Sequence, residues 1–213
     1  MEIAVFQFSM FGINTYVVFD PESKKCAIID PGMSNPFEEK AIDDFIAKKG
    51  LTLTNIINTH LHIDHVVGVA YLKGKYNVPV MAHEGDEFLG ERLSDQARMF
   101  GLAMNLDSVK ISQYLKDGDI IKIGDGVLNV IGVPGHSKGS VALYDPNGGF
   151  LISGDALFKS SIGRTDLPGG NYSELIDNIK TKLLSLPENT VVYPGHGPST
   201  TIGDEKKRNP FLT

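Results

Sequence analysis

The stretch THLHIDH, residues 59 to 65, places four potential metal ligands within six residues. It follows the apolar run LTNIIN, residues 53 to 58, which predicts a buried strand. Burying an imidazole or carboxylate group without a partner costs several kcal/mol, so four such groups beside one buried strand indicate that they share a binding partner. We therefore expect these four side chains, His60, His62, Asp64 and His65, to bind metal.

The spacing within this stretch divides the ligands between two ions. If the chain stays extended beyond the strand, His60 and His62 point the same way, and one ion can take both. Asp64 and His65 come one turn later and can face a second ion. Two ions about 3.5 to 4 Å apart can share a hydroxide and lower its pKa from 15.7 towards about 7.

Further candidate ligands recur after other predicted strands. His136 lies in PGHS, Asp155 in SGDALF and His196 in PGHG, each flanked by glycine or serine. A structural zinc site would more often use thiolates, and the chain has a single cysteine, Cys26. The set therefore favours a catalytic site for two divalent ions, with zinc as the first expectation and iron or manganese as alternatives.

Other residues near these motifs receive more ordinary interpretations. Cys26 lies in the apolar run CAIID and is expected in the core. His83, in MAHEGDE, has no comparable neighbours, so we expect a structural or rim role for it. Asp30 and Thr59 adjoin the ligand motifs and are candidates for orienting the ligands.

Composition narrows the class of protein. A chain of 213 residues with 41% hydrophobic and 22% charged residues fits one globular domain, residues 1–213. A formal charge of −6 with scattered Lys and Arg argues against nucleic-acid binding. No apolar run approaches the roughly 20 residues of a membrane span, and the N-terminus does not resemble a signal peptide. The lone cysteine fits a reducing compartment, so we expect a cytoplasmic protein.

The apolar patterns predict strands in both halves of the chain, with helices after or between them. We expect strands in residues 2–8, 14–19, 25–30, 53–58 and 77–82, and then in residues 120–123, 127–133, 140–145, 150–153 and 190–194. Helices are expected at 35–50, with Asn35 as N-cap, and at 172–184, capped by Ser173 as the last helix. Residues 84–104 predict a broken helical flap. The pattern indicates an α/β (α+β) fold of two mixed sheets packed face to face with helices outside.

THLHIDH, followed in order by PGHS, SGDALF and YPGHG, resembles the metallo-beta-lactamase superfamily over nearly the whole chain. The resemblance implies a four-layer αββα sandwich with the metals at one sheet edge. It also implies one role for each ligand: His60, His62 and His136 on the first ion, Asp64, His65 and His196 on the second, and Asp155 as the bridge. Asp64 is implied as a catalytic residue that holds the hydroxide in line.

Two longer stretches, residues 154–170 and 191–212, resemble the compact glyoxalase II-like enzymes, also called hydroxyacylglutathione hydrolases. The implied reaction is hydrolysis of an acyl thioester such as S-lactoylglutathione. Zinc β-lactamases commonly have a cysteine where this chain has Asp155, which points away from antibiotic hydrolysis.

A glutathione thioester is an anionic small molecule, so its pocket should offer cations. Lys138, Lys159 and Arg164 lie on the loops that carry His136 or follow Asp155, and we expect them to bind substrate. The alternatives are solvated charge for the two lysines and a structural ion pair for Arg164.

Other functions of the same motif set stay open at this point. A mononuclear iron persulfide dioxygenase would share the GRTD stretch, residues 163–166. Lactone or phosphodiester hydrolysis on the same metals is a further alternative, and a non-enzymatic metal-binding module is the last. The sequence leaves the oligomeric state undetermined.

Overall fold

Two six-stranded sheets form the centre of the computed structural model, which describes residues 1–8, 10–104 and 106–213. The first sheet has the order β1-β2-β3-β4-β5-β6. Its strands are Glu2–Phe8, Ile13–Phe19, Lys25–Ile29, Thr52–Ile57, Val80–His83 and Gln113–Leu115. The pairs from β3 to β6 are parallel and the others antiparallel, so the sheet is mixed.

The second sheet has the order β14-β13-β10-β9-β8-β7. From β7 to β10 its strands are Ile120–Ile123, Gly126–Gly132, Val141–Asp145 and Phe150–Gly154, and β13 and β14 are Val191–Pro194 and Thr200–Thr201. Only β10 and β13 pair in parallel. A separate small hairpin joins β11, Leu157–Phe158, to β12, Ser161–Ile162.

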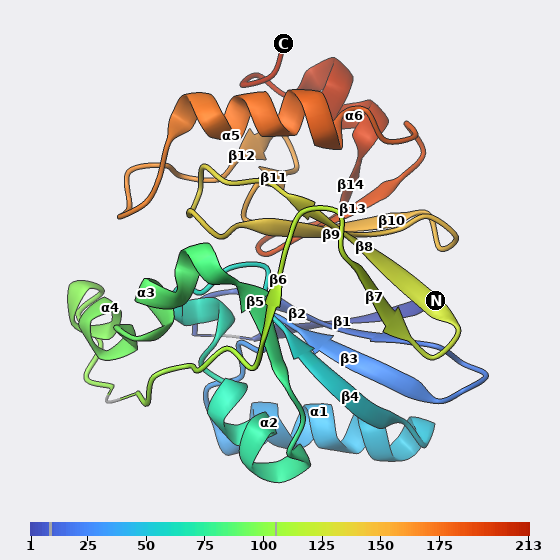
Figure 1. Cartoon of the computed structure of the whole chain (residues 1–213), viewed down its shortest axis with the longest axis vertical. Coiled ribbons are helices and arrows are strands. Elements are labelled where there is room, and N and C mark those ends of the chain that lie inside the picture. The colour runs from blue at the N-terminus through green and yellow to red at the C-terminus, as the bar shows by residue number, and fades with distance from the viewer. Residues whose placement is uncertain (9, 105) are drawn as a thin grey trace.

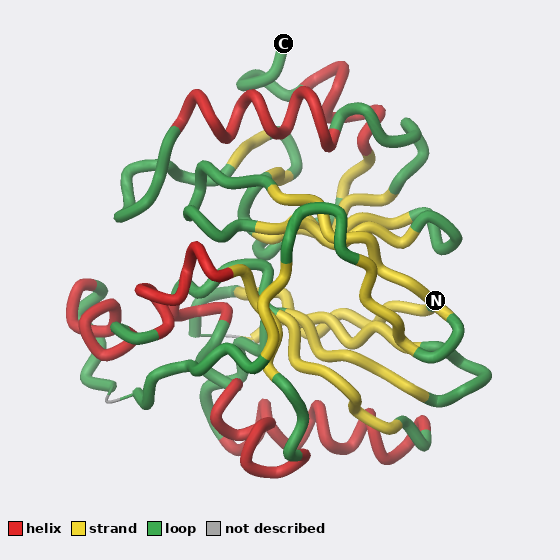
Figure 2. The backbone as a smooth tube through the Cα atoms, in the orientation of Figure 1, coloured by secondary structure: helices red, strands yellow, loops and turns green. Residues whose placement is uncertain are grey.

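Helices cover the outer faces of both sheets, as Figure 1 shows. Below the first sheet lie α1, Pro36–Lys49, and α2, Val69–Tyr76; above the second lie α5, Tyr172–Asn178, and α6, Ile202–Arg208. The tube in Figure 2 makes the resulting helix, sheet, sheet, helix layering visible. The predicted α/β class and four-layer αββα sandwich are thus confirmed. No helix in the described ranges is long and apolar enough to cross a membrane.

Three apolar layers hold these elements together. Strand β2 is buried along its whole length because Val17 faces the helical layer while Tyr16 and Val18 face the second sheet. Burial on both sides explains why β2 and β3 read as nearly continuous apolar runs. Cys26 on β3 is fully buried, as predicted, and burial raises the pKa of its thiol to about 12.

Helix α1 begins and ends as its sequence predicts. Asn35 accepts hydrogen bonds from the backbone N–H groups of Phe37 and Glu38, and Pro36 takes the first helical position. Gly50 ends the helix with φ 64°, a left-handed conformation that glycine adopts without strain.

The C-terminal region differs from the prediction in the cap of the helix, in its continuation as an α-helix and in its place as the last helix. The N-cap of α5 is Asn171, whose side chain accepts from Glu174 N; the predicted cap, Ser173, instead donates to Asn171 at 3.0 Å. The helix predicted at 172–184 changes to a π-helical turn at Ile179–Leu183. It is also not the last helix, because α6 follows β14. The seven residues of α6, IGDEKKR, carry too little apolar periodicity to predict a helix.

The predicted flap is helical in three short pieces. They are a 3-10 turn at Glu84–Asp86, α3 at Glu87–Gly90 and α4 at Leu93–Met99. The predicted flap extended to residue 104, but residues 100 to 104 are not helical, and Gly101 adopts φ 70° there. The flap lies beside the sheets at one end of the sandwich (Figure 1).

The two sheets are fastened together where β13 ends. Asn14 N, on β2, donates to Gly195 O at 2.7 Å, and the Asn14 side chain donates to Pro194 O and Gly197 O at 3.0 and 2.8 Å. Tyr16 Oη also donates to Pro194 O. These bonds bring the chain after β13 against the first sheet.

A polar tie joins α1 to α2. The Asp43 carboxylate accepts hydrogen bonds from Tyr71, Lys75 and Tyr76. Partial burial raises the pKa of this carboxyl, but the three donors outweigh that effect and hold the pKa below its usual range. The ionised carboxylate therefore stabilises the packing of the two helices.

We expect Asp43→Asn to lower the free energy of unfolding at pH 7 by about 1 to 2 kcal/mol, because the tie loses its charge. The fold lowers the pKa of this carboxyl, so its contribution is present above the unfolded-state pKa of about 3.9 and disappears as the pH falls through the folded-state pKa. The gap between wild type and variant should therefore shrink on acidification. Urea unfolding followed by circular dichroism at several pH values measures it.

Asp44→Asn is the matched control, one position along the same helix. Asp44 pairs with Lys40 at 2.6 Å, but both side chains are about two-thirds exposed, at 65% and 68%. We expect a loss of less than about 0.5 kcal/mol for this exposed pair. Equal losses for the two variants at pH 7 would contradict a special role for the Asp43 tie.

Candidate metal centre

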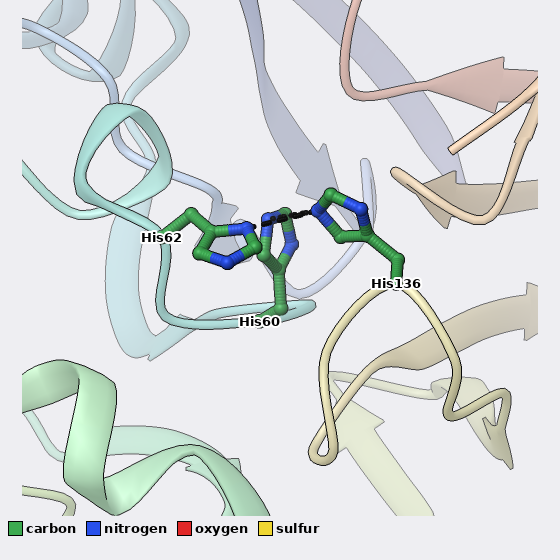
Figure 3. A group of neighbouring side chains, drawn as sticks. All are labelled: His60, His62 and His136. Carbon is green, nitrogen blue, oxygen red and sulfur yellow. Dashed lines mark hydrogen bonds between the residues drawn. The ribbon is translucent and has the colours of Figure 1, made fainter. Parts of the chain in front are cut away.

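Three imidazole rings meet where the loop after β4 faces the loop after β8 (Figure 3). His60 and His62 lie on the first loop and His136 on the second, and all three are buried. His136 Nε2 lies 2.9 Å from His62 Nδ1 and 3.3 Å from His60 Nε2. Three ring nitrogens from two sheets therefore converge on one point.

A second group lies beside the first. His65 ends a 3-10 turn, Ile63–His65, and His196 follows β13. Asp64 Oδ2 lies 3.0 Å from His196 Nε2 and 3.8 Å from His65 Nε2. In each of the two groups, one ligand atom per residue lies within 4.8 Å of the others. The structure thus brings together the same two triads that the sequence analysis assigned to separate ions.

The Asp155 carboxylate lies between the triads. Its Oδ1 is 3.3 Å from His65 Nε2, and its Oδ2 is 3.8 Å from both His136 Nε2 and His196 Nε2. Gly195 permits this approach, because a Cβ at that position would lie 2.1 Å from Asp155 Oδ1. The placement suits the bridging role expected of Asp155.

Asp30 and Thr59 contact the ligands as expected from their neighbouring positions. Asp30 accepts from Thr59 N and from Thr59 Oγ1, both at 2.7 Å. The Thr59 hydroxyl, having given its proton to Asp30, can accept from His60 Nδ1 at 3.1 Å. Asp30 Oδ2 also lies 3.0 Å from His65 Nδ1. A proton held on Nδ1 of His60 leaves its Nε2 lone pair facing the cluster.

His136 is oriented in the same way by a backbone group. Its Nδ1 donates to the carbonyl oxygen of Arg164 at 2.8 Å, which leaves Nε2 as the lone pair. His62 differs, because it presents Nδ1 to the triad and its buried Nε2 has no hydrogen-bond partner among the described residues.

Burial keeps two imidazoles of the first triad, His60 and His62, uncharged. Burial, helped by the neighbouring rings of His65 and His136, holds the pKa of His60 well below its usual range. Burial and the ring of His136 lower the pKa of His62 to about 3. Both imidazoles are therefore neutral near pH 7 and can offer lone pairs.

The second triad has the opposite electrostatic character. Burial disfavours a charged His65, but three nearby carboxylates outweigh this effect and raise its pKa well above the usual range. They belong to Asp30, Asp64 and Asp155. At His196 too, the raising effects of Asp64 and Asp155 prevail over burial and raise the pKa. Negative charge at this triad therefore stabilises a cation.

The donor set fits divalent metal ions. His65 Nε2 and Asp155 Oδ1 are buried 3.3 Å apart, yet neither has a hydrogen bond of good geometry within the described ranges. Nitrogens bound to tetrahedral zinc at about 2.0 to 2.1 Å lie about 3.3 Å apart, which matches the 3.3 Å between Nε2 of His60 and His136. Converging lone pairs and unpaired carboxylate oxygens imply bound cations.

Two flap residues that the sequence did not single out contact the ligand loops. Asp86 accepts from Leu61 N at 3.1 Å and from Ser137 Oγ at 2.7 Å. Gln96, on α4, accepts from Ile63 N at 3.0 Å. An acid and an amide are ordinary on an exposed helical flap, so no sequence pattern indicated that both would be buried.

A cleft of about 190 Å³ opens over the cluster. Its walls are largely apolar and include Phe11, Ile63, Phe100 and Leu167. Of the three cations expected to bind substrate, only Arg164 is among the lining residues in the described part of the chain.

The three predicted cations have different surroundings. Arg164 makes two hydrogen bonds of 2.7 Å to Asp166, the ion pair that the sequence offered as its alternative role. Lys138 Nζ lies 5.9 Å from the centre of the Phe88 ring. Lys159 is exposed at the turn between β11 and β12. Substrate contact by these residues stays a prediction.

His83 lies apart from the metal ligands, consistent with a structural role. Its Nδ1 accepts from Gly85 N at 2.9 Å and caps the first turn of the flap. It belongs to none of the ligand groups found among the described residues.

Comparison with known proteins agrees with this geometry. The model of the metallo-beta-lactamase superfamily matches residues 10–196. The hydroxyacylglutathione hydrolase GloC of Haemophilus influenzae is 37% identical over 214 aligned residues, which cover 100% of this chain and 98% of that protein.

Two solved structures extend the likeness to the backbone. The BLEG-1 B3 metallo-beta-lactamase is 35% identical with a TM-score of 0.90, and 100% of each chain is covered. TTHA1623 in a di-iron-bound form is 39% identical with a TM-score of 0.86, covering 98% of this chain and 100% of that one. Because the family model matches residues 10–196 and a relative is 37% identical over the full chain, this chain belongs to the metallo-beta-lactamase superfamily.

Proposed function

We propose that this chain is a dinuclear metal-dependent hydrolase that cleaves acyl thioesters such as S-lactoylglutathione. The observation that carries the proposal is the position of the Asp155 carboxylate between the two ligand triads. Its oxygens lie 3.8 Å from His136 Nε2 in the first triad, and 3.3 and 3.8 Å from Nε2 of His65 and His196 in the second. A family of metal-dependent hydrolases and a full-length relative named as a hydroxyacylglutathione hydrolase support it.

In this proposal the first ion is held by His60, His62 and His136 and the second by Asp64, His65 and His196, with Asp155 shared. Bound divalent ions would lower the pKa of water and polarise the carbonyl under attack. Asp64 is the residue proposed to orient that water. Despite burial, its imidazole neighbours His65 and His196 hold its carboxyl pKa below the usual range, so it is ionised at neutral pH and can accept a hydrogen bond.

The apolar cleft walls shield the reacting carbonyl from bulk water. Phe11, Phe100 and Leu167 surround the ligands, and electrostatic interactions strengthen where water is excluded. The protein is proposed to act in the cytoplasm, because its single cysteine fits a reducing compartment, and on a small molecule, because a net charge of −6 argues against nucleic acid.

Zinc is the first candidate metal because catalytic zinc sites use imidazole and carboxylate ligands and keep a position open for water. Iron is a specific alternative, since TTHA1623 was solved in a di-iron-bound form. The same ligand types accept both metals.

Hydrolysis of β-lactams is a second candidate function. Asp155 in place of the cysteine common in zinc β-lactamases speaks against it, but the close likeness to a structure named as a B3 metallo-beta-lactamase favours it. Both reactions need the same activated water, so they differ in how the cleft binds the acyl group. A substrate panel separates them more directly than the metal site can.

We expect about two divalent ions per purified wild-type chain, and Asp155→Asn should lower this number and reduce thiol release from S-lactoylglutathione at least about 100-fold. The variant loses the negative charge shared by both triads. Elemental analysis measures the ions, and a thiol-reactive dye measures turnover.

His83→Ala is the matched control, because it removes an imidazole outside the cluster. It should keep the metal content and the turnover number. If the wild-type protein bound two ions, released no thiol and hydrolysed a β-lactam rapidly, β-lactam hydrolysis would replace thioester hydrolysis as the proposed function. One iron per chain with oxygen uptake on glutathione persulfide would contradict both hydrolytic candidates.

Arg164→Gln should raise KM for S-lactoylglutathione about fivefold with little change in kcat, because an exposed charge contact contributes about 1 kcal/mol to binding. A thioester of an uncharged thiol should be unaffected. Steady-state kinetics on both substrates tests this expectation.

Asp166→Asn provides the complementary variant, since it frees the guanidinium that Asp166 holds by two hydrogen bonds. KM for S-lactoylglutathione should then stay the same or fall. If Arg164→Gln changed KM equally for charged and uncharged thioesters, the arginine would act on loop structure and not on substrate charge.

A further inference from the structure

Asp86 is a fully buried carboxylate outside the ligand set. Its Oδ2 accepts from Leu61 N at 3.1 Å and from Ser137 Oγ at 2.7 Å, while its Oδ1 accepts from Gly139 N at 2.7 Å. Both oxygens are therefore used, and each donor is a buried backbone or hydroxyl group. Leaving any one of these buried groups unpaired would cost about 1 to 3 kcal/mol, so the carboxylate and its three donors stabilise this arrangement together.

These three donors belong to the two loops that carry the first triad. Leu61 lies between His60 and His62, and Ser137 directly follows His136. One loop extends from the first sheet and the other from the second. The carboxylate therefore spans the same gap that the first metal ion would span.

The loop after His136 is shaped to receive this carboxylate. A Cβ at position 139 would lie 2.7 Å from Asp86 Cγ, so glycine is needed for the approach. Ser137 Oγ lies 2.7 Å from Ser140 Oγ, which also accepts from Ser137 N at 3.1 Å. The turn is thus fixed on both sides of the contact.

The second triad is held by different contacts. Asp30 lies against His65, and Asp64 pairs with His196. None of the hydrogen bonds that Asp86 makes among the described residues reaches these side chains. Loss of the Asp86 carboxylate should therefore affect one triad more than the other.

We propose that Asp86 is a positioning residue that sets the spacing of His60, His62 and His136 by joining their two loops, and so governs the affinity of the first metal site alone. The inference rests on the proposed two-ion centre. In Asp86→Asn, an amide N–H replaces one acceptor and opposes a buried donor, so the loops separate.

The test measures each site in isolation. In a His196→Ala background, which leaves the first triad intact, adding Asp86→Asn should weaken Zn²⁺ binding about 10- to 100-fold in competition with a chromophoric chelator. In a His136→Ala background, which leaves the second triad intact, the same change should weaken binding less than about threefold. Equal weakening in both backgrounds would overturn the inference.

Asp145→Asn is the matched control, because Asp145 is also a buried carboxylate with three donors: the N-terminal amine, Asn147 N and Gly148 N. It ends β9, far along the strand from the ligands. It should lower the melting temperature of the metal-free protein as Asp86→Asn does, yet leave both affinities unchanged. A loss of first-site affinity in this control would mean that general destabilisation is the cause, which overturns the inference.

Ser137→Ala decides the matter if Asp86→Asn does not fold. It removes one of the three contacts, so first-site affinity should fall in the same direction by a smaller factor, and an unchanged affinity would overturn the inference. Failure of the proposed function is distinguishable: without a two-ion centre, wild-type protein would bind fewer than two ions before any substitution is made, and without thioesterase activity the wild type would release no thiol while both metal affinities stayed measurable.

Discussion

The apolar layer between the sheets holds the carboxyl ends of β4, β8, β10 and β13 at one edge, and the metal centre depends on this alignment. His60, His136, Asp155 and His196 each follow one of these strands. Their ligand atoms approach within 4 Å although they come from two sheets. Because packed sheets resist sliding, the sandwich fixes the spacing that flexible loops alone could not.

The groups around the cluster orient its ligands. Lone pairs of three imidazoles meet at the first triad, and carboxylates crowd the second. Thr59 and the carbonyl of Arg164 hold the Nδ1 protons of His60 and His136 away from the cluster, so that both Nε2 lone pairs face it. Asp30 adopts φ 51°, a left-handed conformation that only a few residue types besides glycine, aspartate among them, tolerate, and the surrounding bonds maintain it. Local strain is thus tolerated where it orients ligands.

The flap connects the fold to the site in a different way. Its three short helical pieces carry Asp86 and Gln96 inward, and Phe100 from the segment after α4 lines the cleft. One segment therefore both contacts the ligand loops and lines the cleft above the cluster. Variation in the flap can alter substrate choice while the metal ligands stay the same.

The sequence by itself determined the ligand set, the sheet-forming runs and the well-capped helix α1, because each has a local signal: clustered imidazoles, apolar runs and an Asn-Pro start. Tertiary structure decided the rest. Asp86 and Gln96 contact the ligand loops only because they are buried against segments distant in sequence, and α6 forms without an apolar period of its own. For Arg164 the sequence offered both a contact with substrate and an ion pair; the structure shows the pair with Asp166 and places Arg164 in the wall of the cleft, and the contact with substrate stays a prediction. Side-chain partners across the gap between sheets are set by packing, which no local pattern records.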